Sequence, residues 1–462
     1  MKSLLPFSTL LLLCCFASNA QNIYRTVCQG NIARLDSLLQ KVEINAQDER
    51  GRSLLHWAVG CNKKEIFEYL VAKGIIVTTE DNDGVTPLYM AVRFQNMSLF
   101  NKILALQPNT KWKKRHGGEL LAKAVLNKDL AFVQQLVANG VDINAKNKRG
   151  NTALTIAQKT KANEIATWLT ESGADKKLVQ NIILKGPFMG QEPPGNTARV
   201  FASNFISTEE YEFGSVFNAD GTEFYYGVDT GGKSEIRYAE LKDNKWSSPR
   251  ILLSHEEYGY NDPFLSPDEN RLYFISNQAM DGIGEQKDID IWYVNRTENG
   301  WSKPINAGPN INTSSEEYYI SFTNKGTMYF ATDAYSDESN KNHDIYYSKF
   351  VNGEFQKAMR LGDAINTDAY EADVFVAPDE TYLIFCAQRR EGLGRGDLYI
   401  SFKKADGSWS TAANMGNKIN TEGHELCPFV TQDGKYFFYT SKQDIYWIST
   451  EIIAELKATV FK

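Results

Sequence analysis

Residues 204–213 read NFISTEEYEF, and this stretch decides how the second half of the chain folds. Three later segments share its design: NINTSSEEYY at 310–319, AINTDAYEAD at 364–373 and KINTEGHELC at 418–427. In those three, an Ile-Asn-Thr ends one repeat and an acidic residue opens the next. Ile206-Ser207-Thr208 has the same form, although no repeat precedes it. The chain therefore contains the end of a repeat before its first complete repeat.

The repeats that follow are built from strands. Five segments join a tight turn to alternating aromatic residues, which is the pattern of a β-hairpin. They are NADGTEFYY (218–226), SPDENRLYF (266–274), TNKGTMYFA (323–331), APDETYLIF (377–385) and TQDGKYFFY (431–439). A further strand begins at Asp290, Asp344, Asp397 and Asp444, with a weaker counterpart at Glu235. Four strands in about fifty residues are typical of one blade of a β-propeller.

The fifth unit ends after its third strand, so its fourth strand is missing from the C-terminal end. ARVFASNFIST, at 198–208, supplies that strand from in front of the first unit. Closing the ring in this way leaves no unpaired sheet edge. The sequence therefore predicts five blades.

The segment NDPFLSPDENRLYFISN resembles the blades of TolB-type, WD-like propellers of bacterial cell envelopes, and the resemblance extends from 199 to about 450. TolB itself has six blades, so six is the alternative. The resemblance implies a cell-envelope protein.

The first part of the chain repeats with a different period. Gly51, Gly84, Gly117 and Gly150 are each 33 residues apart, and columns of Leu and Ala keep the same period. DNDGVTPLYMAV places Asp-Gly at a turn, then a Thr cap and a Pro in the first helical turn. These features resemble the ankyrin repeat family, with about five repeats in residues 21–176. The resemblance implies a helical solenoid that binds partners through its concave face and hairpin tips and has no reaction chemistry of its own.

The remaining segments are a leader, a connector and a C-terminal helix. Lys2, the apolar run 4–16 and Ser18-Asn19-Ala20 form a secretory signal peptide, residues 1–20, which we expect to be cleaved after Ala20. No other segment has eighteen apolar residues, so we expect no membrane insertion. Residues 177–198 are rich in Pro and Gly and predict an extended connector before the propeller domain, 199–462. Ile452, Ile453 and Leu456 have helical spacing and are expected to pack on the propeller.

Charge and motifs limit the function. Residues 21–176 carry a net charge of +7 and residues 199–462 a net charge of −16, and an acidic propeller disfavours nucleic acid. Nucleophile, zinc-protease and phosphate-loop motifs are absent, so no catalytic residue, cofactor or metal is expected. We expect an exported, non-enzymatic interaction or scaffold protein with a protein partner, periplasmic or alternatively secreted. A five-bladed glycan-active enzyme or glycan-binding protein is the alternative.

Candidate binding residues fall in both arrays. Glu212, Tyr260, Glu317, Glu371 and Glu425 begin the innermost strands. They predict either a ligand site for a cation or basic peptide at the channel mouth, or carboxylates that satisfy backbone amides between blades. Lys113, Lys114, Arg115 and His116 are expected on an ankyrin hairpin tip, as a partner-binding patch or as a solvated turn.

Four cysteines remain after signal cleavage, and free or buried thiols are the first expectation. A disulfide between Cys386 and Cys427 is the preferred alternative, because their strand ends are expected on one face of adjacent blades. A bond between Cys28 and Cys61 is disfavoured, because stacked helices lie about 10 Å apart.

Overall fold

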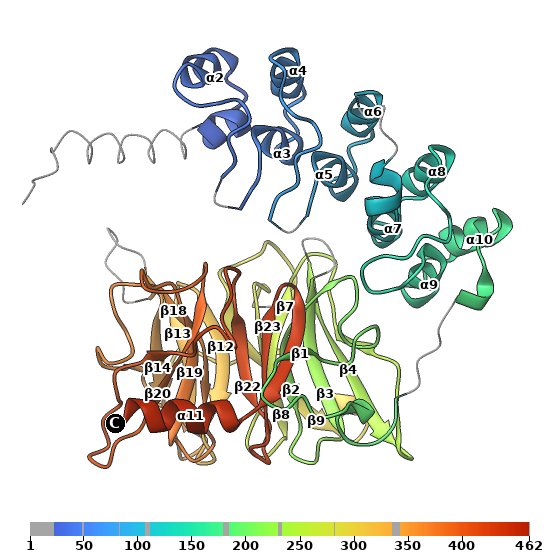
Figure 1. Ribbon diagram of the computed structural model, residues 1–462. Coiled ribbons are helices and arrows are strands. Elements are labelled where there is room, and N and C mark those ends of the chain that lie inside the picture. The colour runs from blue at the N-terminus through green and yellow to red at the C-terminus, as the bar shows by residue number, and fades with distance from the viewer. Residues whose placement is uncertain are drawn as a thin grey trace, which may run out of the picture. The chain divides into compact units, whose positions relative to one another are not determined.

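The computed structural model describes residues 23–48, 50–82, 84–106, 111–178, 184–229, 233–280, 282–334 and 342–461 (Figure 1). The chain forms two compact units, 1–181 and 182–462. The predicted signal peptide lies outside the described residues. Among those described, no helix is both long and apolar enough to cross a membrane.

The first unit is a stack of helix pairs. Residues 23–29 are also helical, and the named helices are α2 (Ile32–Leu39), α3 (Leu54–Gly60), α4 (Lys64–Ala72), α5 (Pro87–Arg93), α6 (Met97–Ala105), α7 (Lys111–Leu126), α8 (Leu130–Ala138), α9 (Ala153–Lys159) and α10 (Asn163–Glu171), followed by the 3-10 turn η1 (Lys176–Leu178). The first helices of successive pairs, α3, α5, α7 and α9, pack side by side, and each also packs on the second helix of its own pair. This is the predicted solenoid.

The helix starts follow the expected cap chemistry. Thr86 Oγ1 accepts a hydrogen bond from the Tyr89 amide at 3.2 Å, and Pro87 follows as the first helical residue. Thr152 caps α9 in the same way. These caps satisfy amides that the first helical turn leaves without partners, so Thr86 and Thr152 mark the starts of their helices.

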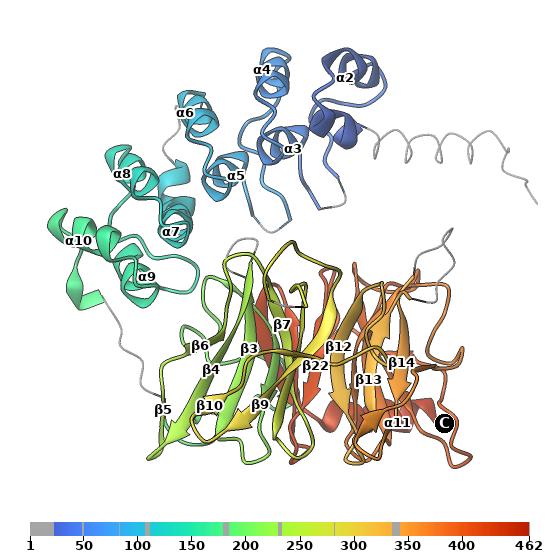
Figure 2. The ribbon, with the colours of Figure 1, turned by 180° about the vertical axis from the view of Figure 1, so that it is seen from behind.

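The second unit consists of five antiparallel blades, three with four strands and two with five, so the predicted number of blades is confirmed. The innermost strands β2 (Tyr211–Phe217), β7 (Tyr260–Leu265), β12 (Glu317–Phe322), β18 (Glu371–Val376) and β22 (Leu426–Val430) neighbour one another in a ring (Figures 1 and 2). The second strands are β3 (Glu223–Asp229), β8 (Arg271–Ser276), β13 (Met328–Thr332), β19 (Tyr382–Ala387) and β23 (Tyr436–Ser441).

The outer parts of the blades complete each sheet. The third strands are β4 (Ser234–Lys242), β9 (Asp290–Thr297), β14 (Asp344–Ser348), β20 (Asp397–Phe402) and β24 (Asp444–Ser449). The edges are β5 (Lys245–Trp246) with β6 (Arg250–Leu253), β10 (Gly300–Trp301) with β11 (Ile305–Asn306), β17 (Met359–Arg360), β21 (Ala413–Asn414) and β1 (Arg199–Val200). A small hairpin, β15 (Phe350–Val351) and β16 (Glu354–Phe355), stands apart from the third blade.

The ring closes as predicted. β1 pairs antiparallel with β24, so that Arg199 faces Trp447 and Val200 faces Tyr446. The Phe201 amide continues the contact with a 2.8 Å hydrogen bond to the Ile445 carbonyl. The first strand of the unit therefore completes its last blade.

The segment expected to be a connector is partly a packed element of the propeller. The Trp246 amide donates to the Leu184 carbonyl at 3.0 Å, and Trp246 Nε1 donates to the Gly186 carbonyl at 2.8 Å. Phe188 packs against the rings of Phe217, Tyr436 and Trp447. The prediction of an extended connector is therefore wrong from residue 184 onward, because aromatic burial outweighs the Pro and Gly content.

Helix α11 (Glu451–Val460) ends the chain. Its Ile452 and Ile453 are buried, and Leu456 packs against the same propeller core. This confirms the predicted docking of the C-terminal helix.

Candidate binding sites

The Ile-Asn-Thr segments join neighbouring blades. The Asn side chain accepts from and donates to the backbone of the preceding third strand, as Asn312 does with Ile291 at 2.8 Å in both directions. The next residue, Thr313, donates to Glu317 of the following blade through its hydroxyl at 2.8 Å and its amide at 3.1 Å. The same set of bonds recurs at Asn366 with Glu371 and at Asn420 with Glu425.

The first blade uses a reduced version of this arrangement. Thr208 contacts Glu212 through its hydroxyl, and Ser207 Oγ takes the place of the Asn by donating to the Ile445 carbonyl at 3.4 Å. Ile445 belongs to β24, so this contact also fixes the closing strand to the last blade. The Ile-Ser-Thr form of the opening motif thus reflects the ring closure.

The predicted glutamate column belongs to this network of hydrogen bonds between blades. Glu212, Glu317, Glu371 and Glu425 are each 0% exposed. Tyr260, the fifth member, is buried and donates to Gln278 Oε1 at 2.8 Å. Burial raises the pKa of Glu317 to about 7 despite the hydrogen bonds it accepts from Thr313 and Thr332. The geometry matches the structural alternative for these residues, with hydrogen bonds that span blades.

A cavity of about 390 Å³ lies in the propeller, beside the residues that follow the glutamate column by two positions on the innermost strands. Each innermost strand has a β-bulge there, and one residue of each bulge has positive φ. These residues are Gly214, Asp262, Tyr319, Asp373 and Cys427, with φ between 47° and 53°. The bulges turn this column toward the channel, and three of its members, Asp262, Asp373 and Cys427, line the cavity.

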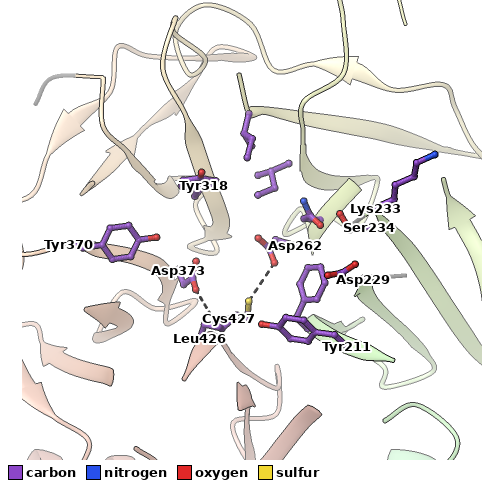
Figure 3. A pocket seen from close by; sticks show the side chains of 14 residues that line it. Tyr211, Asp229, Lys233, Ser234, Asp262, Tyr318, Tyr370, Asp373, Leu426 and Cys427 are labelled. Atoms are coloured by element: carbon purple, nitrogen blue, oxygen red, sulfur yellow. Dashed lines mark hydrogen bonds between the residues drawn. The ribbon is translucent and has the colours of Figure 1, made fainter. Parts of the chain in front are cut away.

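Two carboxylates and a thiol meet at this point (Figure 3). Cys427 Sγ lies 3.4 Å from Asp262 Oδ1, and the Cys427 amide donates to Asp373 Oδ2 at 3.3 Å. Burial raises the pKa of both Asp262 and Asp373, and repulsion from Asp373 adds to the shift at Asp262. Burial and the two aspartates also raise the pKa of the Cys427 thiol, so it is held in the neutral form.

Glycine at 214 leaves the space that Asp262 occupies. A Cβ at this position would lie 2.5 Å from Asp262 Oδ1. Tyr211, Tyr318 and Tyr370 add aromatic walls to the cavity, and Lys233 and Ser234 lie on its lining. Within the described residues, no group of three or more His, Cys, Asp or Glu is arranged to hold a metal ion.

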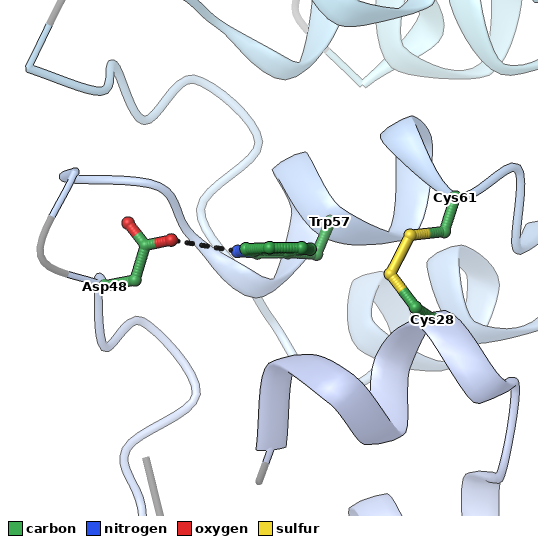
Figure 4. The surroundings of a disulfide bond; sticks show 4 residues. All are labelled: Cys28, Asp48, Trp57 and Cys61. Atoms are coloured by element: carbon green, nitrogen blue, oxygen red, sulfur yellow. Dashed lines mark hydrogen bonds between the residues drawn. A yellow bond between two sulfur atoms is a disulfide. The ribbon is translucent and has the colours of Figure 1, made fainter. Parts of the chain in front are cut away.

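The expectation of free, buried thiols is confirmed for Cys386 and Cys427, whereas the prediction that Cys28 and Cys61 stay unbonded and the alternative of a Cys386–Cys427 bond are wrong. Cys28 and Cys61 form a disulfide with a Cα–Cα distance of 5.3 Å (Figure 4). Cys386 and Cys427 are free and buried. The spacing of stacked helix axes does not exclude this bond, because Cys61 is the C-terminal cap of α3 and Cys28 lies near the end of its own helix, residues 23–29. Cys386 instead lies 3.3 Å from His424 Nε2, and Cys427 faces the channel.

The basic run also differs from its prediction. Lys113, Lys114, Arg115 and His116 lie in α7 and not on a hairpin tip. The helix includes Gly117 and Gly118, where a Cβ would come within 2.8 Å of Val141 Cγ1 and 2.2 Å of the Lys146 carbonyl oxygen, respectively. These glycines therefore permit close packing and do not form a turn. Arg115 and His116 pair with Glu80 of the neighbouring repeat at 2.9 and 3.2 Å.

Equivalent positions on the first helices form one column along the stack. Trp57 of α3, Met90 of α5 and Lys123 of α7 are 33 residues apart, and all three are half-buried. Trp57 Nε1 donates to Asp48 Oδ2 at 3.1 Å (Figure 4). The Arg52 guanidinium lies 4.2 Å from the Trp57 ring centroid. We call Trp57, Met90 and Lys123 the inner-helix column.

Sequence reasoning recognised the repeating glutamates and missed the cavity. The sequence signal for the cavity is a position at which the blades differ. Two residues after each member of the glutamate column, the five blades carry Gly, Asp, Tyr, Asp and Cys. Positions that hold the fold recur in every blade, whereas a binding site within the ring needs different residues in different blades.

A protein-family model described as ankyrin repeats (3 copies) matches residues 23–111 and 95–180. An ankyrin repeat protein of Fowlpox virus is 31% identical over 120 residues, covering 26% of this chain and 83% of the relative. An ankyrin repeat protein of Acanthamoeba polyphaga mimivirus is 25% identical over 139 residues, covering 29% of this chain.

The match to that mimivirus relative spans 18% of its length. Among solved structures, the human ASB11 ankyrin repeat domain is 23% identical, with a TM-score of 0.30, and covers 33% of this chain and 69% of that chain.

Proposed function

Because this chain belongs to the ankyrin repeat family through its first unit, we propose that it is an exported, non-enzymatic interaction protein of the bacterial cell envelope, located in the periplasm. The observation that carries the proposal is the ankyrin solenoid itself, since stacked repeats leave an extended surface for a protein partner. The propeller adds a second unit with faces of its own.

The inner-helix column is the surface we assign to the partner. Trp57 offers an aromatic ring, Met90 an adaptable apolar side chain and Lys123 a positive charge, a combination suited to an interface. The net charge of +7 over residues 21–176 favours an acidic partner.

Export is supported by two independent features. The signal-peptide pattern of residues 1–20 is one of them. The other is the disulfide between Cys28 and Cys61, because such bonds persist in oxidising compartments and are rare in the cytosol. The resemblance of the blades to TolB-type propellers favours the cell envelope by analogy.

The non-enzymatic assignment rests on how the recurring carboxylates are used. Glu317, Glu371 and Glu425 each accept two hydrogen bonds from a Thr four residues earlier, so their role is to join blades. A glycosidase needs two carboxyl groups in unequal roles on opposite sides of a sugar. We therefore keep the glycan-active enzyme as the alternative to be tested and not as the conclusion.

Cross-linked capture in the native host tests the proposal. The full chain is compared with a Met90→Gln/Lys123→Glu variant and with Lys64→Glu, an exposed charge reversal on α4. We expect a partner that the wild type and Lys64→Glu capture equally and that the double variant recovers at least about tenfold less, a change that one strong contact can produce. Equal recovery by all three chains, with unchanged melting curves, would contradict binding through the inner-helix column.

A further inference from the structure

The cavity in the propeller channel has a chemical character that the proposed function does not use. It breaks the fivefold repeat, since Asp262 of β7 and Asp373 of β18 have Gly, Tyr and Cys at the equivalent positions of the other blades. Two carboxylates at one point of a ring are not required for its closure, because three blades do without them. Their placement therefore calls for a ligand.

The two carboxylates have little contact with bulk water, since Asp262 is buried and Asp373 is half-buried. Asp262 is 9% exposed and is bonded to the Cys427 thiol, and Asp373 accepts from the Cys427 amide. Within the described chain, neither carboxylate forms a hydrogen bond or ion pair with a Lys, Arg or His side chain. Two carboxylates so placed without a counterion either retain protons or attract a cation from solution, so an added cation would favour their charged form.

The other walls suit an organic cation. Tyr211, Tyr318 and Tyr370 line the same cavity, and Figure 3 places Tyr370 beside Asp373 and Tyr211 below Asp262. Aromatic faces attract ammonium groups through their negative π-surfaces. A volume of about 390 Å³ is within the range of small-molecule sites.

A metal ion fits the cavity less well than an ammonium group. Hard divalent cations take about six to eight oxygen ligands, and zinc takes about four close ligands. Here two carboxylates stand with a neutral thiol, and no cluster of three suitable side chains occurs among the described residues. A primary ammonium instead needs only a few acceptors for its three N–H groups.

We propose that this cavity binds the primary ammonium group of a small organic ligand. Asp262 and Asp373 accept hydrogen bonds from its N–H groups, and the aromatic rings of Tyr211, Tyr318 and Tyr370 surround it. The inference does not rest on the partner-binding role of the ankyrin unit. Cys427 acts as a positioning residue, because its thiol and amide hold the two carboxylates.

Binding is expected to depend on pH. The titratable and charged groups facing the pair are Cys427, Asp229 and Lys233 together with the three tyrosines. Burial raises the pKa of both aspartates, so an empty site retains protons at a pH where an exposed carboxyl has lost them. An ammonium ligand favours the charged carboxylates, so its affinity rises as the pH rises through their titration range, and protons are released on binding.

Isothermal titration of the full chain with n-butylammonium chloride tests the proposal. The variants are Asp262→Asn and Asp373→Asn, and Asp243→Asn, in an exposed turn, is the matched control. We expect one site with a Kd of about 1–10 mM at pH 8, given the small size of the probe. The affinity should fall at least about tenfold at pH 5 and in both cavity variants but not in the control.

Melting curves show whether each variant is folded, so a loss of binding is separated from a loss of structure. The inference is overturned if n-butylammonium gives no saturable heat up to about 50 mM, well above the expected Kd. It is also overturned if 1-butanol binds equally, if both cavity variants bind like the wild type, or if Ca²⁺ binds more tightly and displaces the amine.

Discussion

Replacing Phe201 with Ala should lower the free energy of unfolding of the propeller more than almost any other single truncation. Phe201 follows β1 directly and is 0% exposed. Its ring packs against Phe217 and Phe224 of the first blade and against Phe438 and Trp447 of the last, at centroid distances of 5.0 to 5.9 Å. The side chain thus ties the closing strand to the two blades that meet at the closure.

The magnitude follows from the burial. Truncating a fully buried Phe to Ala destabilises a protein by about 3–5 kcal/mol, and the four aromatic neighbours place Phe201 in the upper part of that range, about 4–5 kcal/mol. Phe350→Ala is the control, since Phe350 lies in the same unit and is 38% exposed. Its loss should cost below about 1 kcal/mol.

Hydrogen exchange read by mass spectrometry along a urea gradient is the appropriate assay, because the peptides report each unit separately. We expect the midpoint of the propeller peptides to fall strongly in Phe201→Ala, and the ankyrin peptides to keep their wild-type midpoint. Equal propeller midpoints in the two variants would refute the reasoning that residues before the first complete repeat hold the ring closed.

Three further predictions follow from the two units. Reducing the Cys28–Cys61 bond should lower the free energy of unfolding of the ankyrin unit by about 2–4 kcal/mol without changing the propeller, as urea melts with and without reductant would show. Gly214→Ala should destabilise the propeller by about 1–3 kcal/mol more than Gly221→Ala. Both glycines have positive φ, but only a Cβ at 214 would collide with Asp262, so the difference between their melting curves isolates that contact, and equal curves would refute it. The raised pKa values of Asp262 and Asp373 mean that the folded pair binds protons more tightly than the unfolded chain, so the stability that it contributes below about pH 4 is lost as the pH rises through neutral. Asp262→Asn should therefore flatten the pH dependence of the propeller melting temperature and raise that temperature at pH 8. An unchanged pH profile would show that folding does not raise the pKa values of the pair.

The fold could be predicted because its information is repeated along the chain. The 33-residue repeats and the blades of about fifty residues each specify one local structure several times along the chain. Ile206-Ser207-Thr208, which no repeat precedes, indicates how the ring closes. Ser207 even keeps the contact of the missing Asn, by donating to a β24 carbonyl. Local pattern and global closure agree, so the sequence specifies one architecture.

The remaining features depend on tertiary contacts that no local pattern contains. The disulfide depends on where Cys28 and Cys61 stand at the ends of their helices, not on the spacing of the helix axes. Gly117 keeps the 33-residue period of the turn glycines Gly51, Gly84 and Gly150 but lies in α7, with Val141 packed close against it. The aspartate pair combines residues 111 positions apart, at bulges that the strand pattern does not reveal.

The intact mass of the protein recovered from its native host tests the proposed export most directly. We predict that the chain is found in the periplasmic fraction, begins at Gln21 and is lighter than the fully reduced mature chain by two hydrogens, which are lost in the Cys28–Cys61 bond. Recovery in the cytosolic fraction, with Met1 and the leader retained and every cysteine reduced, would contradict the proposal of an exported interaction protein.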